Sequence, residues 1–215
     1  MARQNNATEA QRQALRQALL ARRRAIPAAE LDPMAAAVAE RVLPLMECPA
    51  TVAGYLAFGK ELPVTALMKQ LREQGCTTAV PIVEPASRLR FTPFDDDTPM
   101  RKNGFGIDEP DVPPDLSIPR EALDVVLVPL VGFDRALYRM GMGGGYYDRF
   151  FAPAADRAPS TPAAAPSPDA QAGRMPTLIG VACECQLVDS VLPAEWDIRL
   201  DMIATEARLF TPPGD

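Results

Sequence analysis

The sequence has no histidine in its 215 residues. That absence excludes Ser-His-Asp and Cys-His catalysis, so an acid–base step must use Asp, Glu, Tyr or Lys, or the substrate itself. Cysteine is also scarce: the residues are Cys48, Cys76, Cys183 and Cys185, and none forms a Cys-x-x-Cys pair. The usual ligands of structural zinc are therefore missing. Cys183 and Cys185 are too close in sequence for an ordinary bridge, and we expect all cysteines to be reduced thiols.

Long apolar runs are absent too. No run approaches the ~18 residues that a membrane span requires, and Met1 opens onto a polar stretch rather than the apolar core of a signal peptide. The net charge of -6 favours solubility and gives no reason to expect nucleic acid, while an apolar content of 47% argues against global disorder. We therefore expect a cytoplasmic, monomeric, single-domain protein with no nucleic-acid or membrane partner.

The first segment of the chain is rich in arginine. It carries six arginines and one acid, Glu9, between Arg3 and Arg24. Thr8 and Gln11 predict a capping box that opens a helix ending near residue 25. At ~100° per residue, this helix has an apolar stripe and, beside it, a basic stripe about 40° wide. The apolar stripe holds Leu15, Leu19 and Ile26, and the basic stripe holds Arg12, Arg16 and Arg23. The basic stripe suits an anionic ligand, and the alternative is a solvated helix face.

Strands and helices alternate along the rest of the chain. Asp32 and Pro33 fit an N-cap followed by proline at the first helical position, which predicts a helix to about residue 43. Further helices are predicted at 64–74, closed by Gly75, and from about Tyr146 onward. Strands are predicted at 51–58, 77–83, 89–94, 124–130, 177–183 and 199–204. Their nearly continuous apolar character indicates an α/β fold whose largely parallel sheet is covered by helices on both faces.

One segment departs from this alternation. Residues 152–176 contain nine alanines and six prolines and have almost nothing to bury. We interpret the segment as a mobile surface loop inserted between a helix and the next strand. The alternative is a tract that binds a partner.

The segment with the clearest chemistry follows the strand at 124–130. The glycines Gly141, Gly143, Gly144 and Gly145 precede the helix at Tyr146. Glycines let the backbone approach a ligand closely, and N–H groups at the start of a helix point at an anion. The loop lacks the Gly-Lys-Ser/Thr ending of a P-loop, and Tyr146 stands where a dinucleotide fingerprint requires glycine. With Arg139 as an added donor, the loop is predicted to bind phosphate; a tight structural turn is the alternative.

The same segment resembles the signature of the 5-formyltetrahydrofolate cyclo-ligase family. That signature is a strand ending in proline, then Phe-Asp, then Arg-Leu-Gly-x-Gly-Gly-Gly-Tyr-Tyr-Asp-Arg. Here it is present as Pro129, Phe133-Asp134 and RMGMGGGYYDR from Arg139 to Arg149. Other elements of the family match in order: Arg12, Leu15 and Arg16; Phe58 and Glu61; Gly106, Ile107, Glu109 and Pro110; and LPAEWDIRLDMI from Leu192 to Ile203.

The resemblance implies a single three-layer domain of the NagB/RpiA/CoA-transferase-like type at residues 8–210. It also implies conversion of 5-formyltetrahydrofolate and ATP to 5,10-methenyltetrahydrofolate, ADP and phosphate, with Mg²⁺ as cofactor. In the implied mechanism the formyl oxygen attacks the γ-phosphate, and N10 of the folate closes on the resulting imidate phosphate. The nucleophiles belong to the substrate, so the protein mainly positions charge and excludes water, which agrees with the missing histidine.

The resemblance assigns roles to the residues that match the family motifs. The catalytic residues implied are Arg139, Tyr147 and Asp148. Contacts to ATP are expected from Arg12, Arg16, Arg139, Met140, Gly141, Met142, Gly143, Gly144, Gly145, Tyr146 and Tyr147. Contacts to the folate are expected from Leu56, Phe58, Glu61, Gly143, Gly144, Gly145, Tyr146 and Trp196. Mg²⁺ is expected at Asp148 and Asp197, because hard carboxylates suit that ion. Taken singly, the acids could be ordinary surface residues and the aromatic residues could be core.

The sequence differs from the family pattern at three positions. Leucine stands at residue 137, where the family usually has glycine, and a positive φ there would be costly for a leucine. Arg12 stands where lysine is usual, which keeps the charge but changes its shape. Gly144 stands where some members have lysine.

Two other functions fit the same loop. A sugar-phosphate isomerase or related α/β enzyme would use the glycines for a phosphomonoester and would not need ATP. A non-catalytic nucleotide or folate sensor would bind without turnover. The basic stripe of the first helix favours the cyclo-ligase, since a monoester has little need of a remote basic helix.

Overall fold

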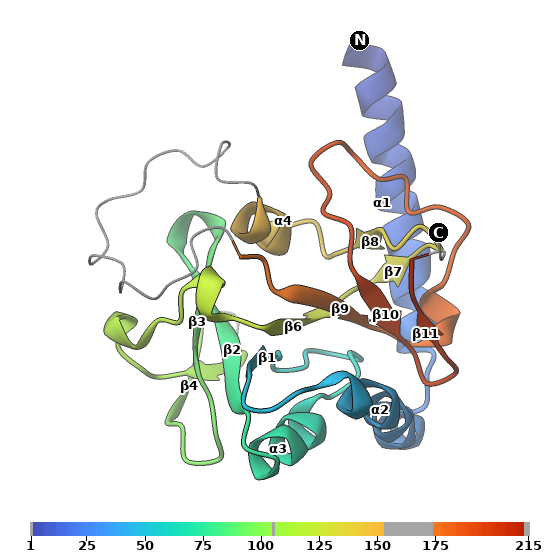
Figure 1. Ribbon diagram of the computed structural model, residues 1–215. Coiled ribbons are helices and arrows are strands. Elements are labelled where there is room, and N and C mark those ends of the chain that lie inside the picture. The colour runs from blue at the N-terminus through green and yellow to red at the C-terminus, as the bar shows by residue number, and fades with distance from the viewer. Residues whose placement is uncertain (1, 105, 153–173, 213–215) are drawn as a thin grey trace.

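The computed structural model describes residues 2–104, 106–152 and 174–212 and is built around a seven-stranded sheet (Figure 1). The strand order is β11-β10-β9-β6-β1-β2-β3. The pairs β1–β2, β1–β6, β6–β9 and β9–β10 are parallel, and the edge strands β3 and β11 are antiparallel to their neighbours. The strands are β1 Thr51–Ala53, β2 Thr77–Glu84, β3 Arg88–Pro93, β6 Val125–Pro129, β9 Thr177–Val181, β10 Met202–Ala204 and β11 Leu209–Phe210.

Helices cover both faces of this sheet. Figure 1 shows α2 and α3 together on one face and α4 on the other, with α1 rising beside the β9 and β10 side of the molecule. The helices are α1 Ala2–Arg24, α2 Ala28–Val42, α3 Thr65–Glu73 and α4 Tyr146–Phe151. The predicted α/β fold with a mostly parallel, doubly covered sheet is therefore confirmed. Among the described residues, no helix combines the length and apolar content that crossing a membrane would require.

The core lies in two layers, one on each face of the sheet. Side chains alternate along β6, so that Leu127 joins the layer under α2 and α3 while Val126 and Val128 join the opposite layer. The first layer includes Val42, Leu67, Met68 and Leu71 from α2 and α3. The second includes Phe91 and Phe151, whose rings lie 6.5 Å apart and join β3 to α4. A smaller cluster joins α1 to the turn after β6 through Leu19, Leu20, Val131, Met140 and Val191.

Two predicted helix starts are wrong. Helix α1 begins at Ala2, so Thr8 lies inside it and cannot be its N-cap. Helix α2 begins at Ala28 after Pro27, and Pro33 lies in its second turn instead of at its first position. A proline this close to the start removes only an early helical hydrogen bond, so the helix tolerates it. The predicted apolar stripe of α1 is confirmed, because Leu19 and Ile26 are buried and Leu15 is partly buried.

The predicted strand at 51–58 is too long. Strand β1 ends at Ala53, although Gly54 still donates a backbone hydrogen bond to Ala79 at 2.8 Å. Short elements escaped prediction because two or three residues show no periodicity. These are the strands β4 Met100–Lys102, β5 Asp108–Pro110, β7 Gly132–Phe133, β8 Arg139–Met140 and β11 Leu209–Phe210, and the 3-10 helices η1 Leu43–Leu45, η2 Pro85–Ser87, η3 Pro114–Leu116, η4 Arg120–Ala122 and η6 Glu184–Gln186. The predicted loop at 152–176 falls largely on residues 153–173, outside the described residues.

The expectation of reduced thiols is wrong for two of the cysteines. Cys48 and Cys76 form a disulfide, with their Cα atoms 5.1 Å apart. It links the segment before β1 to the residue before β2, at the amino ends of two parallel neighbouring strands. The fold brings these two cysteines together, and their separation of 28 residues in the sequence did not predict the bond. Cys183 is a buried free thiol and Cys185 an exposed one.

Candidate functional site

A glycine loop, residues 141–145, connects β8 to α4 beyond the carboxyl end of β6. Gly143 and Gly145 have φ values of 98° and 61°, which a residue with a side chain adopts only at a cost. In the part of the chain that the structure describes, none of the backbone N–H groups from Gly141 to Gly145 donates a hydrogen bond to another protein group. Most of the loop is exposed. It therefore offers a run of backbone donors to a ligand.

Arg16 reaches this loop from helix α1. Its Nε donates to the carbonyl oxygen of Gly141 at 3.0 Å, and its Nη1 donates to Gln13. A Cβ atom placed on Gly143 would lie 3.7 Å from Cζ of Arg16, so the guanidinium lies against the loop. The residue is nevertheless buried. The predicted basic stripe thus brings a fixed positive charge to the predicted phosphate loop.

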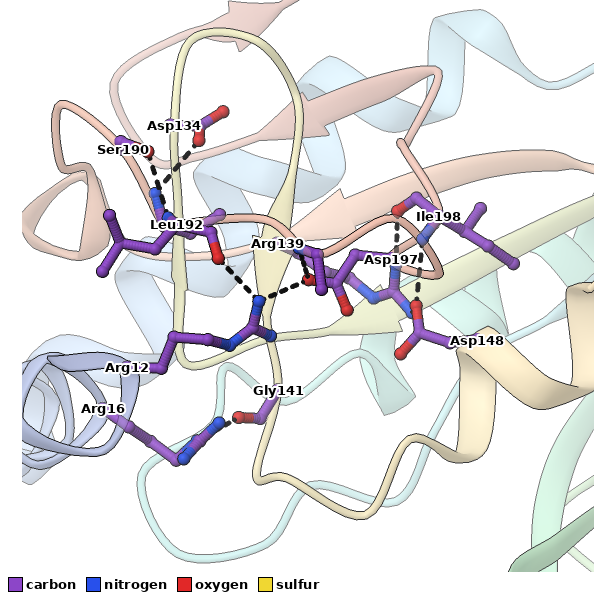
Figure 2. Close-up of polar contacts among 12 residues, drawn as sticks. Arg12, Arg16, Asp134, Arg139, Gly141, Asp148, Ser190, Leu192, Asp197 and Ile198 are labelled. Carbon is purple, nitrogen blue, oxygen red and sulfur yellow. Dashed lines mark hydrogen bonds and ion pairs between the residues drawn. The ribbon is translucent and has the colours of Figure 1, made fainter. Parts of the chain in front are cut away.

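Arg12, one turn earlier on α1, meets the segment that precedes β10. Its Nη1 donates to Asp197 Oδ2 at 2.7 Å and to the carbonyl oxygen of Leu192 at 2.6 Å. The same carboxylate oxygen accepts the backbone N–H of Ala194 at 2.8 Å. Figure 2 shows Arg12 and Arg16 extending side by side from α1, toward Asp197 and Gly141 respectively.

Arg139 and Asp148 lie at the two ends of the glycine loop. Arg139 Nη2 donates to Asp148 Oδ1 at 2.8 Å, and Nη1 donates to the carbonyl oxygen of Ile198 at 2.7 Å. Asp148 Oδ1 also accepts the backbone N–H of Ile198 at 3.1 Å (Figure 2). Arg139 is buried, so its guanidinium joins β8, α4 and the segment before β10. This geometry favours an organising role for Arg139.

The structure brings the residues predicted for ATP and metal into one region. They come from α1, β8, the glycine loop, α4 and the segment before β10, which are far apart in sequence. Met140 has a buried side chain, which leaves only its backbone for a ligand, whereas the side chain of Met142 is exposed. Tyr146 lies under the loop, where a Cβ on Gly144 would collide with its ring, and Arg149 lies over that ring at 5.6 Å.

The predicted metal ligands fit a nucleotide-bound Mg²⁺ better than a site built of protein alone. Within the described part of the chain, the hydrogen bonds of Asp148 use only Oδ1 and those of Asp197 use only Oδ2, which leaves the second oxygen of each carboxylate for a ligand. The described residues contain no group of three or more potential metal ligands. Mg²⁺ commonly takes one or two carboxylates and completes its shell with phosphate and water. The donor set therefore fits that ion.

Leu56, Phe58 and Glu61, three of the residues predicted for the folate, follow β1 in the chain. Glu61 Oε2 accepts the backbone N–H of Phe58 at 3.0 Å, and Oε1 lies 3.5 Å from Arg23 Nη1. Burial raises the pKa of Glu61 above its ordinary value, although the Phe58 N–H and the Arg23 charge act in the opposite direction. Leu56 is half-buried against the first core layer, whereas Phe58 is 54% exposed. A carboxylate acceptor with an exposed aromatic ring beside it can bind a planar heterocycle that carries N–H groups.

Tyr147 connects the folate and phosphate sides of the site. Burial raises the pKa of its phenol well above the ordinary value; the negative charge of Glu61 adds to the effect and Arg139 opposes it. Tyr147 therefore lies within electrostatic reach of both charges and stays a neutral donor. Trp196, next to Asp197 in the chain, has a side chain that is 74% exposed.

Sequence reasoning gave no role to three buried polar residues of this region. Asp134 accepts backbone N–H groups of Ala136, Tyr138 and Val191 and so shapes the turn between β7 and β8. Gln186 donates to the carbonyl oxygens of Leu130 and Val131. Arg23 lay on the predicted basic stripe of α1, and that position was the one available signal for its proximity to Glu61. Leu137 has a φ of 66°, as its replacement of the family's glycine suggested.

Comparisons with known proteins identify the family to which the chain is similar. The model of the 5-formyltetrahydrofolate cyclo-ligase family matches residues 8–206. A 5-formyltetrahydrofolate cyclo-ligase of Escherichia coli strain K12 is 31% identical over 193 residues, which cover 88% of this chain and 97% of that protein. One from Haemophilus influenzae is 32% identical over 151 residues, covering 69% and 72% of the two chains.

A solved structure has the same fold. The 5,10-methenyltetrahydrofolate synthetase of Aquifex aeolicus superposes with a TM-score of 0.73 at 24% identity, over 95% of this chain and 94% of that one. At that identity the likeness bears on the fold alone. The family model extends through the arginines of α1 and the glycine loop, and the E. coli relative covers 88% of the chain, so this chain belongs to the 5-formyltetrahydrofolate cyclo-ligase family.

Proposed function

We propose that this chain catalyses the ATP-dependent cyclisation of 5-formyltetrahydrofolate to 5,10-methenyltetrahydrofolate, with release of ADP and phosphate. The observation that carries the proposal is the junction of Arg16 with the glycine loop, where a buried guanidinium lies 3.0 Å from the Gly141 carbonyl oxygen beside unpaired backbone N–H groups of the described loop. Phosphate oxygens bind to such a combination of cation and amides. The relatives named 5-formyltetrahydrofolate cyclo-ligase support the choice of substrate.

The nucleotide is assigned to the region between α1 and the glycine loop. Arg12 and Arg16 contact the phosphates, and the backbone of residues 140–147 wraps them. Within the described chain Arg12 uses only Nη1 in its hydrogen bonds, so its Nε and Nη2 can serve phosphate oxygens. Asp148 and Asp197 hold Mg²⁺ directly or through water. When bound there, Mg²⁺ supplies positive charge beside the phosphate oxygens.

The folate is assigned to the side of Glu61. Its carboxylate accepts hydrogen bonds from the N–H edge of the pterin, and Leu56, Phe58 and Trp196 contact the ring systems. Tyr147, held neutral between Glu61 and Arg139, donates to an oxygen at the junction of the two substrates. Arg139 acts by holding Asp148 and the start of α4 in place.

The reaction requires little covalent chemistry from the protein. The formyl oxygen attacks the γ-phosphorus, the bond to the β-phosphate oxygen breaks, and ADP leaves. The N10 lone pair then attacks the activated formyl carbon, the carbon–oxygen bond breaks, and phosphate departs with the former formyl oxygen while N10 loses its proton. The arginines and loop amides stabilise charge on the transferring phosphoryl group and orient the reacting atoms, which is the main source of catalysis in phosphoryl transfer.

A direct assay tests the proposal. Purified protein with 5-formyltetrahydrofolate, ATP and Mg²⁺ should form methenyltetrahydrofolate, followed by its near-ultraviolet absorbance, with one ADP per product. Arg16→Ala should raise the KM for ATP on the order of tenfold, because a charge-assisted contact is lost. Gln17→Ala, at an exposed neighbouring position of the same helix, is the matched control. Nucleotide binding without product would indicate a sensor, and turnover of a phosphomonoester without ATP would indicate an isomerase.

A further inference from the structure

A third arginine of α1 is buried away from the phosphate loop. Arg23 lies in the last turn of the helix and is 5% exposed. Its Nη1 donates to the carbonyl oxygen of Leu130 at 3.3 Å and lies 3.5 Å from Glu61 Oε1. Its Nε is buried and has no hydrogen-bond partner among the described residues. The flanking Arg22 and Arg24 are exposed, so the burial is specific to this position.

This arrangement lowers the stability of the folded protein. Burying a guanidinium without satisfying its donors costs free energy, and an apolar side chain of similar size would pack there without that cost. Arg23 lies on the same helical face as Arg12 and Arg16, yet its partners belong to the folate side of the site. A costly polar group at a functional site points to a role in function.

The surroundings of Glu61 show what that role is. Among the described residues, Arg23 from α1, Tyr55 after β1 and Tyr147 from α4 interact electrostatically with its carboxylate, and the Cys183 thiol lies within electrostatic reach of Tyr55 and Arg23. Both phenols have a pKa raised by burial and by Glu61 itself, so they remain neutral. Tyr55 donates its O–H to the carbonyl oxygen of Leu62 at 2.7 Å. Arg23 is therefore the cation that counters the burial of Glu61.

We propose that Arg23 is a positioning residue for the folate substrate: from the end of α1 it keeps the Glu61 carboxylate ionised and oriented to accept the N–H groups of the pterin. The inference rests on the proposed function. One helix then serves both substrates, with Arg12 and Arg16 on the nucleotide side and Arg23 on the folate side.

Steady-state kinetics separate this role from a structural one. Arg23→Met, which keeps an apolar side chain of similar length, should raise the KM for 5-formyltetrahydrofolate on the order of tenfold and leave the KM for ATP unchanged. Arg23→Lys should recover part of the loss, since the charge returns without the fork of donors. Arg24→Met removes the same charge from an exposed position and should match the wild type.

The pH dependence and a double variant test the path through Glu61. Loss of the nearby cation raises the pKa of Glu61 further, so in Arg23→Met the acidic fall of kcat/KM for the folate should shift to higher pH. In a Glu61→Gln background, Arg23→Met should change the folate KM less than twofold, because its target is gone.

Several outcomes overturn the inference: an unchanged folate KM, an equal rise in both KM values, or an undiminished effect in the Glu61→Gln background. If Arg23→Met does not fold, Arg23→Lys and its pH profile decide. Failure of the proposed function is distinct, because then the wild type itself forms no methenyltetrahydrofolate.

Discussion

Arg139 and Asp148 form an ion pair of 2.8 Å that joins the two ends of the glycine loop. The arginine begins β8, just before the loop, and the aspartate lies in the first turn of α4 after it. Both also bond to the backbone of Ile198, so three segments meet at one carboxylate. The pair therefore fixes the distance between the two ends of the loop, whose backbone N–H groups are available to a ligand.

Arg139→Ala should lose stability as well as activity. The side chain of Arg139 is 6% exposed and that of Asp148 is 22% exposed, so the variant leaves a poorly solvated carboxylate without its partner. Breaking a buried pair in this way costs roughly 3 kcal/mol. Urea unfolding should show that loss. Arg199→Ala, at an exposed position nearby in the same region, should cost less than about 0.5 kcal/mol. If the two variants unfold at the same urea concentration, the pair does not organise the loop.

Much of the region around the glycine loop could be predicted, because the sequence patterns that indicate it lie within short segments. A strand followed by glycines and an aromatic helix start predicts where a loop must bend, and a basic stripe predicts which way a helix presents charge. The inward turn of Arg139 and the pairing of Arg23 with Glu61 were not predictable, since each depends on segments from distant parts of the chain. The Cys48–Cys76 bond was hidden for the same reason. The short strands β7 and β8 exist because they pair with each other, and two residues alone carry no pattern.

Glu61→Gln should stabilise the protein at neutral pH while weakening folate binding. The folded-state pKa of Glu61 is raised, mainly by burial, so the folded protein holds this proton more tightly than the unfolded chain. Stability from this group is therefore highest at low pH and falls as the pH rises through the folded-state pKa. Glutamine does not ionise, so the variant does not lose this stability as the pH rises, and its side-chain oxygen can still accept the Phe58 N–H.

Thermal melts at several pH values measure this effect. The Tm of Glu61→Gln should exceed that of the wild type at pH 7, and the difference should shrink as the pH falls below the ordinary range of a carboxyl group. Glu195→Gln, at an exposed position, should follow the wild type throughout. A Tm for Glu61→Gln below that of the wild type at neutral pH would contradict the destabilising burial of Glu61.

Reduction of the Cys48–Cys76 disulfide should lower stability and spare activity. The bonded cysteines are 28 residues apart, and the reduced chain entropy of the unfolded state predicts a contribution of about 3.6 kcal/mol. It lies at the amino ends of β1 and β2, whereas the glycine loop follows the carboxyl end of β6 in the same parallel sheet. A Cys48→Ala, Cys76→Ala double variant should therefore unfold at lower urea with both KM values unchanged. Thiol titration of the unfolded, unreduced wild type should detect Cys183 and Cys185 alone, and four titratable thiols would exclude the bond.

At Leu137, backbone strain lowers the stability of the fold and burial of the side chain raises it. Its φ of 66° is in the left-handed region, which costs a leucine roughly 1–2 kcal/mol, but its side chain is fully buried in the layer beneath α4. Truncating such a leucine costs about 3–5 kcal/mol, so the packing term is larger and the sequence keeps leucine where the family usually has glycine.

Both Leu137→Ala and Leu137→Gly should therefore be destabilised, in an unusual order. Alanine loses the packing and keeps the strain, whereas glycine loses the packing and relieves the strain, so Leu137→Gly should be the more stable variant by about 1 kcal/mol. At Leu200, also buried but without a positive φ, the usual order applies and Leu200→Gly should be the less stable of the pair. Urea unfolding of the four variants gives both differences. The same order at both positions would mean that the backbone at residue 137 is not strained.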